Sequence, residues 1–413
     1  MSNSILTDSI IVKESLRELK NQLSFTKSVN RQYDDRFAVS GAKRGDTINI
    51  RKPSRFEVTD GAALNIQDVE DESLPLTLDN HKHVGMAFSN KDLTLSIDEF
   101  RERYIKPAVT PLANSVDYIG YSQMYKKVFS SVGVPHASTL PSTLKGFTKA
   151  KAKIAGLGGA TDPLCAVVDP MVEASLVEGL SGLFQSSNQI SKQYEKGEMG
   201  MAAGSTFKMS QNVSKHTAGA IAGTPIVKTT ITAQGTEALV IDDITGSIAG
   251  AYRAGDSIQL AGVYAVNPQT KQSTGELAQF VVTADADAVS TEIAALAISP
   301  AMYSTGPKQN VDALPVAGAA VTQFGHATSY SGVIAPQNMV FHKDAFALGC
   351  ADFELPGGMD MAARASDPES GLSISFVRGY DIVNHRMISR LDILFGWACL
   401  YPEFACRVVG QPA

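Results

Sequence analysis

Residues 251–267 read AYRAGDSIQLAGVYAVN, with a short run of alternating apolar and polar residues on either side of LAGV. Alternation with a period of two is typical of half-buried strands, and LAGV indicates a tight turn. We therefore expect two short strands of a compact β unit. The sequence on both sides has a different character, so the position of this unit in the interior of a 413-residue chain needs an explanation.

The β character extends over residues 223–325. In this interval charge is sparse, and Ala, Thr, Val, Gly and Ser dominate. Further strand patterns are TPIVKTTITA, ALVIDDI, AQFVVTADA and TEIAALAIS, separated by Gly, Asp, Asn and Pro. Short strands at this spacing predict a small all-β barrel or sandwich.

The segments around the β unit mix helical and strand patterns. A helix is expected at 144–156 (LKGFTKAKAKIAG), a strand at 164–169 (LCAVVD), and a second helix with Pro170 in its first turn. STFKMSQNV, SISFVRGYDI, ISRLDILFGWACL and YPEFACRVVG predict further strands. This mixture indicates an α/β or α+β domain that begins before the β unit and ends after it.

Residues 9–29 carry a helical pattern. Its apolar stripe is narrow and consists of Ile11, Leu16, Leu19 and Leu23. We therefore expect this helix to lie on another surface rather than inside a core.

A long helix is expected over residues 97–128. Ser96 and Glu99 form a capping box at its start. Pro107 and Pro111 would bend it, so the segment is predicted to be one bent helix or two abutting ones.

Between these helices lies a polar excursion at residues 40–90, where two alternating runs predict a long two-stranded hairpin. An isolated hairpin is marginally stable in water, so a long one is expected to rest on a neighbour, although an ordinary solvated hairpin is the alternative. Its first arm is basic and its far side is acidic. The basic residues are Lys43, Arg44, Arg51, Lys52 and Arg55, and the acidic ones are Asp68, Glu70, Asp71 and Glu72.

The bulk composition is that of a globular chain, with 44% hydrophobic and 19% charged residues. The length favours two or three units. A net charge of -6 disfavours tight nucleic-acid binding, which needs clustered Lys and Arg. No signal-peptide pattern or membrane-spanning run is found, so a soluble protein is expected. The four cysteines form no CxxC pair and are expected to be buried.

Motifs for enzyme chemistry are absent: there is no GKS or GKT loop, no HExxH and no GxSxG. His81 and His83 share one strand face but lack an evident third metal ligand. The acidic pairs Asp242–Asp243 and Asp285–Asp287 lack EF-hand spacing, and Cys165 has no histidine partner in view. We therefore expect no catalytic residues, no metal, no cofactor and no enzyme.

Three segments together resemble the major capsid (coat) protein of tailed bacteriophages. They are KGEMGMAAGSTFKMSQNV, the terminal MISRLDILFGWACLYPEFACRVVG, and RAGDSIQLAGVYAVN followed by AQFVVTADA. The last resembles the β-barrel inserted in coat proteins of the short-tailed Salmonella phage type. The resemblance runs in order along essentially the whole chain.

This resemblance implies an α+β Hong Kong 97-like capsid fold with an inserted small all-β barrel. The implied parts are an N-terminal arm (1–38), extended loop (39–92), spine helix of the peripheral domain (93–136), axial domain (137–222 and 326–372), inserted barrel (223–325) and C-terminal peripheral strands (373–413). The long polar loop that such inserts often carry is expected to be reduced or absent.

The implied function is self-assembly through hexamers and pentamers into the icosahedral shell around double-stranded phage DNA, in the host bacterial cytoplasm. Implied partners are copies of the chain itself, a scaffolding protein and a portal protein, with no membrane and no specific DNA binding. The charged residues of the extended loop are the candidates for contacts between subunits. Glu14 and Glu18, expected on the exposed face of the first helix, are the candidates for facing the scaffold. The alternative function is a β-rich phage decoration or adhesin-type binding protein.

Overall fold

The computed structural model describes residues 8–31, 47–56, 58, 61, 66, 72–88, 106–135, 140–180, 200–324, 332–355, 357, 361–367, 372–381 and 386–411. The chain divides into two compact units, each assembled from separate segments. Unit 1 comprises Met1–Arg51, Ser73–Gly120 and Phe346–Leu400, and unit 2 comprises Lys52–Glu72, Tyr121–Ala345 and Tyr401–Ala413.

Unit 1 is built on an antiparallel sheet around the long strand β23 (Arg386–Cys399). Apolar residues alternate along β23, and Leu391, Ile393, Phe395 and Trp397 are buried. The strands beside it are β20 (Phe346–Ala351), β22 (Leu372–Asp381) and β3 (Asn80–Phe88), and β21 (Met361–Asp367) pairs with β22. A further two-stranded sheet joins β1 (Thr47–Lys52) to β2 (Glu72–Thr77).

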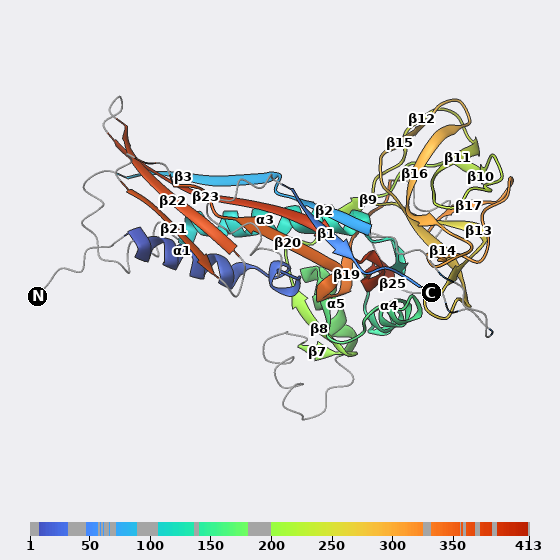
Figure 1. Cartoon of the computed structure of the whole chain (residues 1–413), viewed down its shortest axis with the longest axis horizontal. Coiled ribbons are helices and arrows are strands. Elements are labelled where there is room, and N and C mark those ends of the chain that lie inside the picture. The colour runs from blue at the N-terminus through green and yellow to red at the C-terminus, as the bar shows by residue number, and fades with distance from the viewer. Residues whose placement is uncertain are drawn as a thin grey trace, which may run out of the picture. The chain divides into compact units, whose positions relative to one another are not determined.

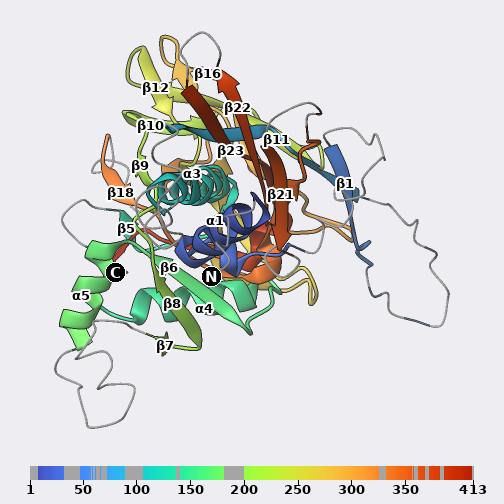
Figure 2. The same ribbon diagram turned by 90° about the vertical axis from the view of Figure 1, so that its left-hand side faces the viewer.

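Helix α1 (Asp8–Gln22) packs against β21 and β22 (Figures 1 and 2). A short helical turn, η1 (Thr26–Ser28), follows it. Asp117, buried on α3 (Lys106–Met124), accepts hydrogen bonds from the backbone amides of residues 24–26 at 2.8–3.2 Å. This carboxylate fixes the end of the N-terminal segment to α3.

The expected long helix is described only from residue 106. It continues through Pro111 to Met124 and ends in the turn η5 (Tyr125–Lys127). The capping box at Ser96 and Glu99 lies outside the described residues. No helix in the described part of the chain is long and apolar enough to cross a membrane.

Unit 2 contains a six-stranded sheet with the order β4-β24-β19-β6-β8-β7. Helices α4 (Lys145–Gly156) and α5 (Pro170–Leu180) form where their patterns predict them. The core between these helices and the sheet includes Phe147, Leu176, Phe207 and Val340. The strands are β4 (Ser131–Val132), β6 (Leu164–Val168), β7 (Met201–Ala202), β8 (Ser205–Met209), β19 (Asn338–His342) and β24 (Ala405–Val408). Two short pairs are β9 (Lys215–Thr217) with β18 (Ile334–Pro336), and β5 (Val134–Pro135) with β25 (Gly410–Gln411).

The inserted β domain forms a second six-stranded sheet in unit 2, with the order β10-β11-β16-β14-β13-β17. A bridge from Ile226 to Ala320 links its two ends, so the sheet nearly closes around its own apolar core. Its longest connection runs from residue 303 to residue 320. The strands are β10 (Gly223–Val227), β11 (Thr236–Ile244), β13 (Ser257–Val266), β14 (Ser273–Val282), β16 (Ile293–Met302) and β17 (Val321–Gln323), and β12 (Ile248–Tyr252) pairs separately with β15 (Ala286–Ala288).

The turn predicted inside LAGV is wrong. Residues 257–266 form one continuous strand, β13, whose register with β14 shifts between Gln259 and Tyr264. Gly262 lies in this interval with φ of +79°, so its left-handed backbone makes a bulge instead of reversing the chain. The reversal comes at 267–272, where Asn267 and Gln272 are hydrogen bonded through their backbones.

The C-terminal fifth of the chain divides between the two units at other residues than the expected boundary between 326–372 and 373–413. Strands β20 and β21, expected with the axial segment, pair into the sheet of unit 1 with β22 and β23. Strand β24, expected with the peripheral strands, pairs with β19 in the sheet of unit 2. The chain therefore changes units at residues 345–346 and again at 400–401.

Candidate functional site

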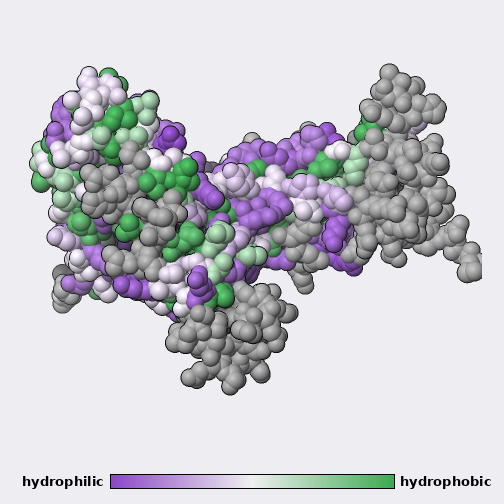
Figure 3. Space-filling model, turned by 180° about the vertical axis from the view of Figure 1, so that it is seen from behind, coloured by the Kyte–Doolittle hydropathy of each residue, from purple (hydrophilic) through white to green (hydrophobic). Residues whose placement is uncertain are grey.

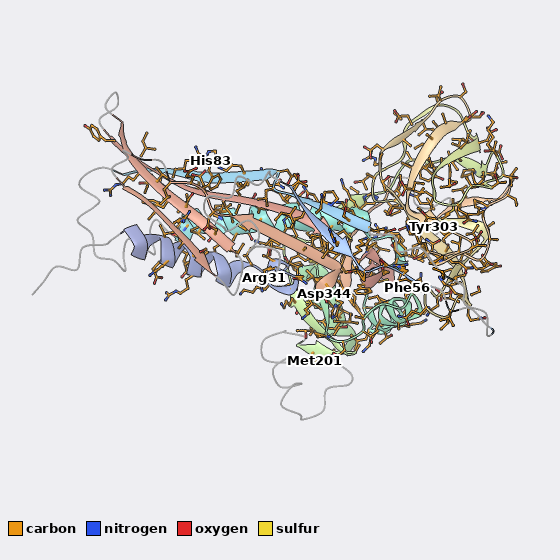
Figure 4. The ribbon with its side chains drawn as sticks, viewed as in Figure 1. Arg31, Phe56, His83, Met201, Tyr303 and Asp344 are labelled. Carbon is orange, nitrogen blue, oxygen red and sulfur yellow. The ribbon has the colours of Figure 1, made fainter. Side chains whose placement is uncertain are left out.

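The segment after β1, predicted to be the base of the extended loop, is fixed by two ion pairs within its own chain. The Arg55 guanidinium donates to Glu403 Oε1 at 2.7 Å, and Lys308 Nζ lies 2.6 Å from Glu72 Oε1. These residues line a cleft of 940 Å³ together with Phe56 and Tyr303, which Figure 4 labels. We call it the loop-base cleft.

The charges of the loop-base cleft reinforce one another. The hydrogen bond from Lys308 holds the pKa of Glu72 below its usual value, and the nearby charges of Lys52 and Arg55 act in the same direction. Lys52 also lies over the Tyr401 ring, 5.8 Å from its centroid. The cleft therefore holds a charged cluster that orients the first residues after β1.

The sequence identifies the charged residues of this segment but does not identify their partners within the chain. Arg55 and Glu72 pair with residues that are distant in sequence, Glu403 and Lys308, and no local pattern marks those two. Arg51 has an exposed side chain. The remaining candidates lie outside the described residues: Lys43, Arg44, Asp68, Glu70 and Asp71.

The expectation that Glu14 and Glu18 share an exposed helix face is wrong for Glu18. Glu18 is 6% exposed, because the side of α1 that carries it packs on β21 and β22. Glu14 is half-buried and pairs with Arg17 at 3.0 Å. The apolar stripe of α1 thus packs on strands of the same chain. The side chain of Ile11, predicted to belong to this stripe, lies outside the described residues.

The other polar groups noted in the sequence have structural partners. His81 Nε2 lies 2.8 Å from Asp392 Oδ1, and its ring centroid is 6.2 Å from that of His83 on the same strand. Asp285 and Asp287 each accept a hydrogen bond from a backbone amide of the inserted domain. Within the described ranges, no cluster of three or more His, Cys, Asp or Glu has metal-site geometry.

The cysteines also show no sign of a reactive site. All four are free thiols, with Cys350, Cys399 and Cys406 buried and Cys165 partly exposed. Burial raises the pKa of Cys406 to about 12, which keeps its thiol protonated and a poor nucleophile.

A buried arginine, which sequence reasoning missed, joins β24 to the part of the inserted domain where β13 begins. Arg407 is 2% exposed. Its guanidinium donates to Gly255 O at 2.6 Å, to Gln337 Oε1 at 3.3 Å and to the Ser257 hydroxyl. Burial lowers the pKa of Arg407 to about 10, so the group is still a cation at neutral pH.

Further buried hydrogen bonds surround Arg407 in what we call the insert junction. Asp256 accepts from the backbone amides of Gly219 and Arg253, and its other oxygen lies 2.7 Å from His216 Nε2. Gln279 exchanges hydrogen bonds with the backbone of Ser131 at 2.7 and 3.1 Å. The inserted domain is thus held to the rest of unit 2 by specific polar contacts.

The surface of the chain carries its apolar residues in scattered positions. Figure 3 shows hydrophobic and hydrophilic residues interspersed on one face. The exposed large apolar side chains come from many separate elements, among them Tyr118, Met171, Met209, Val289 and Ile388. Contacts with other molecules are therefore expected to be mixed in polarity.

Comparison with known proteins places the whole chain in one family. The family model described as P22 coat protein, gene protein 5, matches residues 2–410. No curated protein matches.

Solved structures with detectable similarity include several from phages. One from Mycobacterium phage Che8 is 12% identical, covers 94% of this chain and 91% of its own, and has a TM-score of 0.43. The capsid of Ralstonia phage GP4 is 8% identical over 100% of this chain and 92% of its own, with a TM-score of 0.42. The CUS-3 coat protein I-domain is 24% identical over 25% of this chain and 96% of its own, with a TM-score of 0.19.

Proposed function

Because the chain belongs to the P22 coat protein family, it is the major capsid protein that forms the icosahedral shell of a tailed phage, and we propose that it assembles through hexamers and pentamers. The observation that carries this proposal is the extent of the match, which runs over residues 2–410. A decoration or adhesin module would account for the inserted domain alone and leave the helical flanks unexplained. The protein is a structural component of the virion capsid with the Hong Kong 97-like fold, not an enzyme.

We propose that the two units correspond to the parts implied by the capsid fold. Unit 1, with α1 on the sheet of β21, β22 and β23, represents the arm and the peripheral domain. The sheet and helices of unit 2 represent the axial domain, interrupted by the inserted domain. The segment around β1 and β2 represents the extended loop.

The charged residues of the extended loop are proposed to divide between two roles. Arg55 and Glu72, paired within the chain, set the direction in which the loop leaves unit 2. Arg51, whose side chain is exposed, is the described candidate for a contact with a neighbouring subunit. Exposed ion pairs contribute only about 0–1 kcal/mol each, so such contacts would set register more than strength.

Assembly is proposed to proceed with a scaffolding protein and around a portal protein in the host cytoplasm, with DNA packaged later and bound without sequence specificity. Many weak subunit contacts suffice for a closed shell, because each added contact is made within an assembly that already exists. The acidic net charge of -6 is compatible with an interior that releases DNA.

Sedimentation velocity of the purified protein, with its scaffolding protein added, tests the proposal, and negative-stain imaging identifies any fast species. Closed shells or capsomer rings are the expected result. A chain that remains monomeric with scaffold present would refute shell formation. The subunit-contact role is tested by Arg51→Glu, which should lower shell yield while the monomer stays folded.

A charge exchange separates the two loop roles. Arg55→Glu alone should lower shell yield, and Arg55→Glu combined with Glu403→Arg should restore it, because the pair lies within one chain at 2.7 Å. A double variant as defective as the single one would show that Arg55 acts on another subunit. Normal shells from Arg51→Glu would remove Arg51 from the interface.

A further inference from the structure

Unit 2 contains a large cavity between α4 and the inserted domain. Its volume is 810 Å³, within the range of about 300–1,000 Å³ that small-molecule pockets occupy. One wall comes from α4 and the residues after it, and the other comes from β13 and β14. Apolar residues on the two walls include Ala152, Leu157, Val266, Leu277 and Phe280. We call it the α4 pocket.

One lysine places a cation in the wall of the α4 pocket. Lys153 Nζ donates to Ser131 O at 3.1 Å, and it lies 5.4 Å from the centroid of the Phe324 ring. Burial lowers the pKa of Lys153. Its carboxylate partner, Glu276, is 3.8 Å away with a side chain 66% exposed, so the ion pair is long and partly in solvent.

The other charged residues that line the pocket are Lys149, Glu276 and Glu403. The side chain of Glu276 is largely in solvent, and Glu403 is already paired with Arg55. Lys149 adds a second positive charge near Lys153 and contributes to lowering its pKa. An anionic group entering the pocket would be favoured at Lys153, because the carboxylate partner of this lysine is 3.8 Å away and largely in solvent.

We propose that the α4 pocket binds a small amphipathic carboxylate, with its hydrocarbon part between α4 and β14 and its carboxylate at Lys153 Nζ. Such a ligand would replace a long ion pair by a direct charge-assisted hydrogen bond, and it would fill apolar space. It would contact both walls at once and hold the inserted domain against α4. This inference does not depend on how the shell assembles.

Calorimetric titration of the full-length subunit with three ten-carbon probes tests the proposal: decanoate, decan-1-ol and decylamine. Decanoate should bind about 10- to 100-fold more tightly than decan-1-ol, which is the range that a hydrogen bond to a charged group contributes. Decylamine should bind most weakly, because it brings a second cation to Lys153. Equal affinity for decanoate and decan-1-ol, or no binding of decanoate, would overturn the proposal.

Variants locate the site. Lys153→Met should reduce decanoate affinity to that of decan-1-ol and leave decan-1-ol unchanged. Lys145→Met, on the same helix but outside the pocket lining, is the matched control and should bind like the native chain. Ala152→Phe places a ring at the exposed mouth of the pocket and should weaken decanoate binding at least about tenfold.

Ala152→Phe keeps the test valid if Lys153→Met fails to fold, because Ala152 is exposed and its replacement does not remove a buried contact. Sedimentation and circular dichroism should show each variant folded before titration. Decanoate binding that survives Ala152→Phe undiminished would place the ligand elsewhere and refute the assignment.

Discussion

Replacing Arg407 is expected to loosen the insert junction while unit 1 stays unchanged. The guanidinium donates to three acceptors, two of them on the first residues of the inserted-domain segment that leads into β13. In Arg407→Met the side chain keeps its apolar contacts and loses all three hydrogen bonds. The acceptors Gly255 O and Gln337 Oε1 lose this donor, and buried acceptors without a partner are costly.

The expected cost follows from two opposing terms. Three hydrogen bonds from a charged donor contribute about 1.5–3 kcal/mol each, so losing them costs about 4–9 kcal/mol. Removing a buried cation recovers several kcal/mol of desolvation. The net loss for Arg407→Met is therefore about 2–4 kcal/mol. This corresponds to an increase of about 30- to 900-fold in the local opening equilibrium.

Arg407→Lys separates hydrogen-bond geometry from charge. The ammonium retains the buried cation but lacks the planar fork that reaches Gly255 and Ser257 together. We therefore expect the lysine variant to be at least as destabilised as the methionine variant, although the substitution conserves charge.

Hydrogen exchange of the unassembled subunit, followed by mass spectrometry, measures this opening locally. Peptides covering 253–260 and 405–409 should exchange faster in both variants, and peptides from β23 in unit 1 should exchange as in the native chain. Native-like exchange in Arg407→Lys would refute the reasoning about geometry. An increase below about threefold in Arg407→Met would refute the whole estimate.

Three further changes test other parts of the structure. Asp117→Ala should cost about 2–5 kcal/mol, because three backbone amides lose their acceptor, and urea unfolding followed by the fluorescence of Trp397 should detect it. Gly120→Ala should cost about 1–3 kcal/mol in the same assay, because its Cβ would overlap the Trp397 ring, whereas Gly156→Ala has open space and should be neutral or stabilising. Burial raises the pKa of Cys406 from 9.0 to about 12, so the unfolded chain releases this proton at lower pH than the folded chain. The free energy of unfolding should therefore fall as pH rises between these values. Cys406→Ala should reduce the difference in this free energy between pH 8 and pH 10, measured by urea unfolding.

Local pattern was sufficient for most elements of unit 2. Helices α4 and α5 and strands β6 and β8 follow from periodicity and from the position of Pro170. Strands β10, β11, β13, β14 and β16 of the inserted domain were also located, because alternation with a period of two is strong there, whereas the short strands β12, β15 and β17 were not predicted. The continuity of β13 was not predicted, since the sequence does not reveal whether a glycine with positive φ makes a turn or a bulge.

The contacts between segments that are distant in sequence could not be predicted from local sequence patterns. Arg55 was predicted to contact another subunit, and its partner within the chain, Glu403, comes from the other end of the sequence. Arg407 was missed because a single arginine in an apolar strand gives no signal until the strand's neighbours are known. The burial of Glu18 depends in the same way on β21 and β22, which are distant in sequence from α1.

The C-terminal segment connects parts of unit 2 that are distant in sequence, and the insert junction is one of these connections. Strand β24 lies between β4 and β19 in the sheet of unit 2, so the last part of the chain completes a sheet whose other strands come much earlier. Arg407, on that strand, then fixes Gly255 and Ser257 in the middle of the chain. The inserted domain has its own apolar core, but its attachment to unit 2 is complete only when β24 is in place. A subunit whose C-terminal strand has not docked therefore lacks the hydrogen bonds from Arg407 to the inserted domain, whereas the contacts of Asp256 and Gln279 do not involve β24.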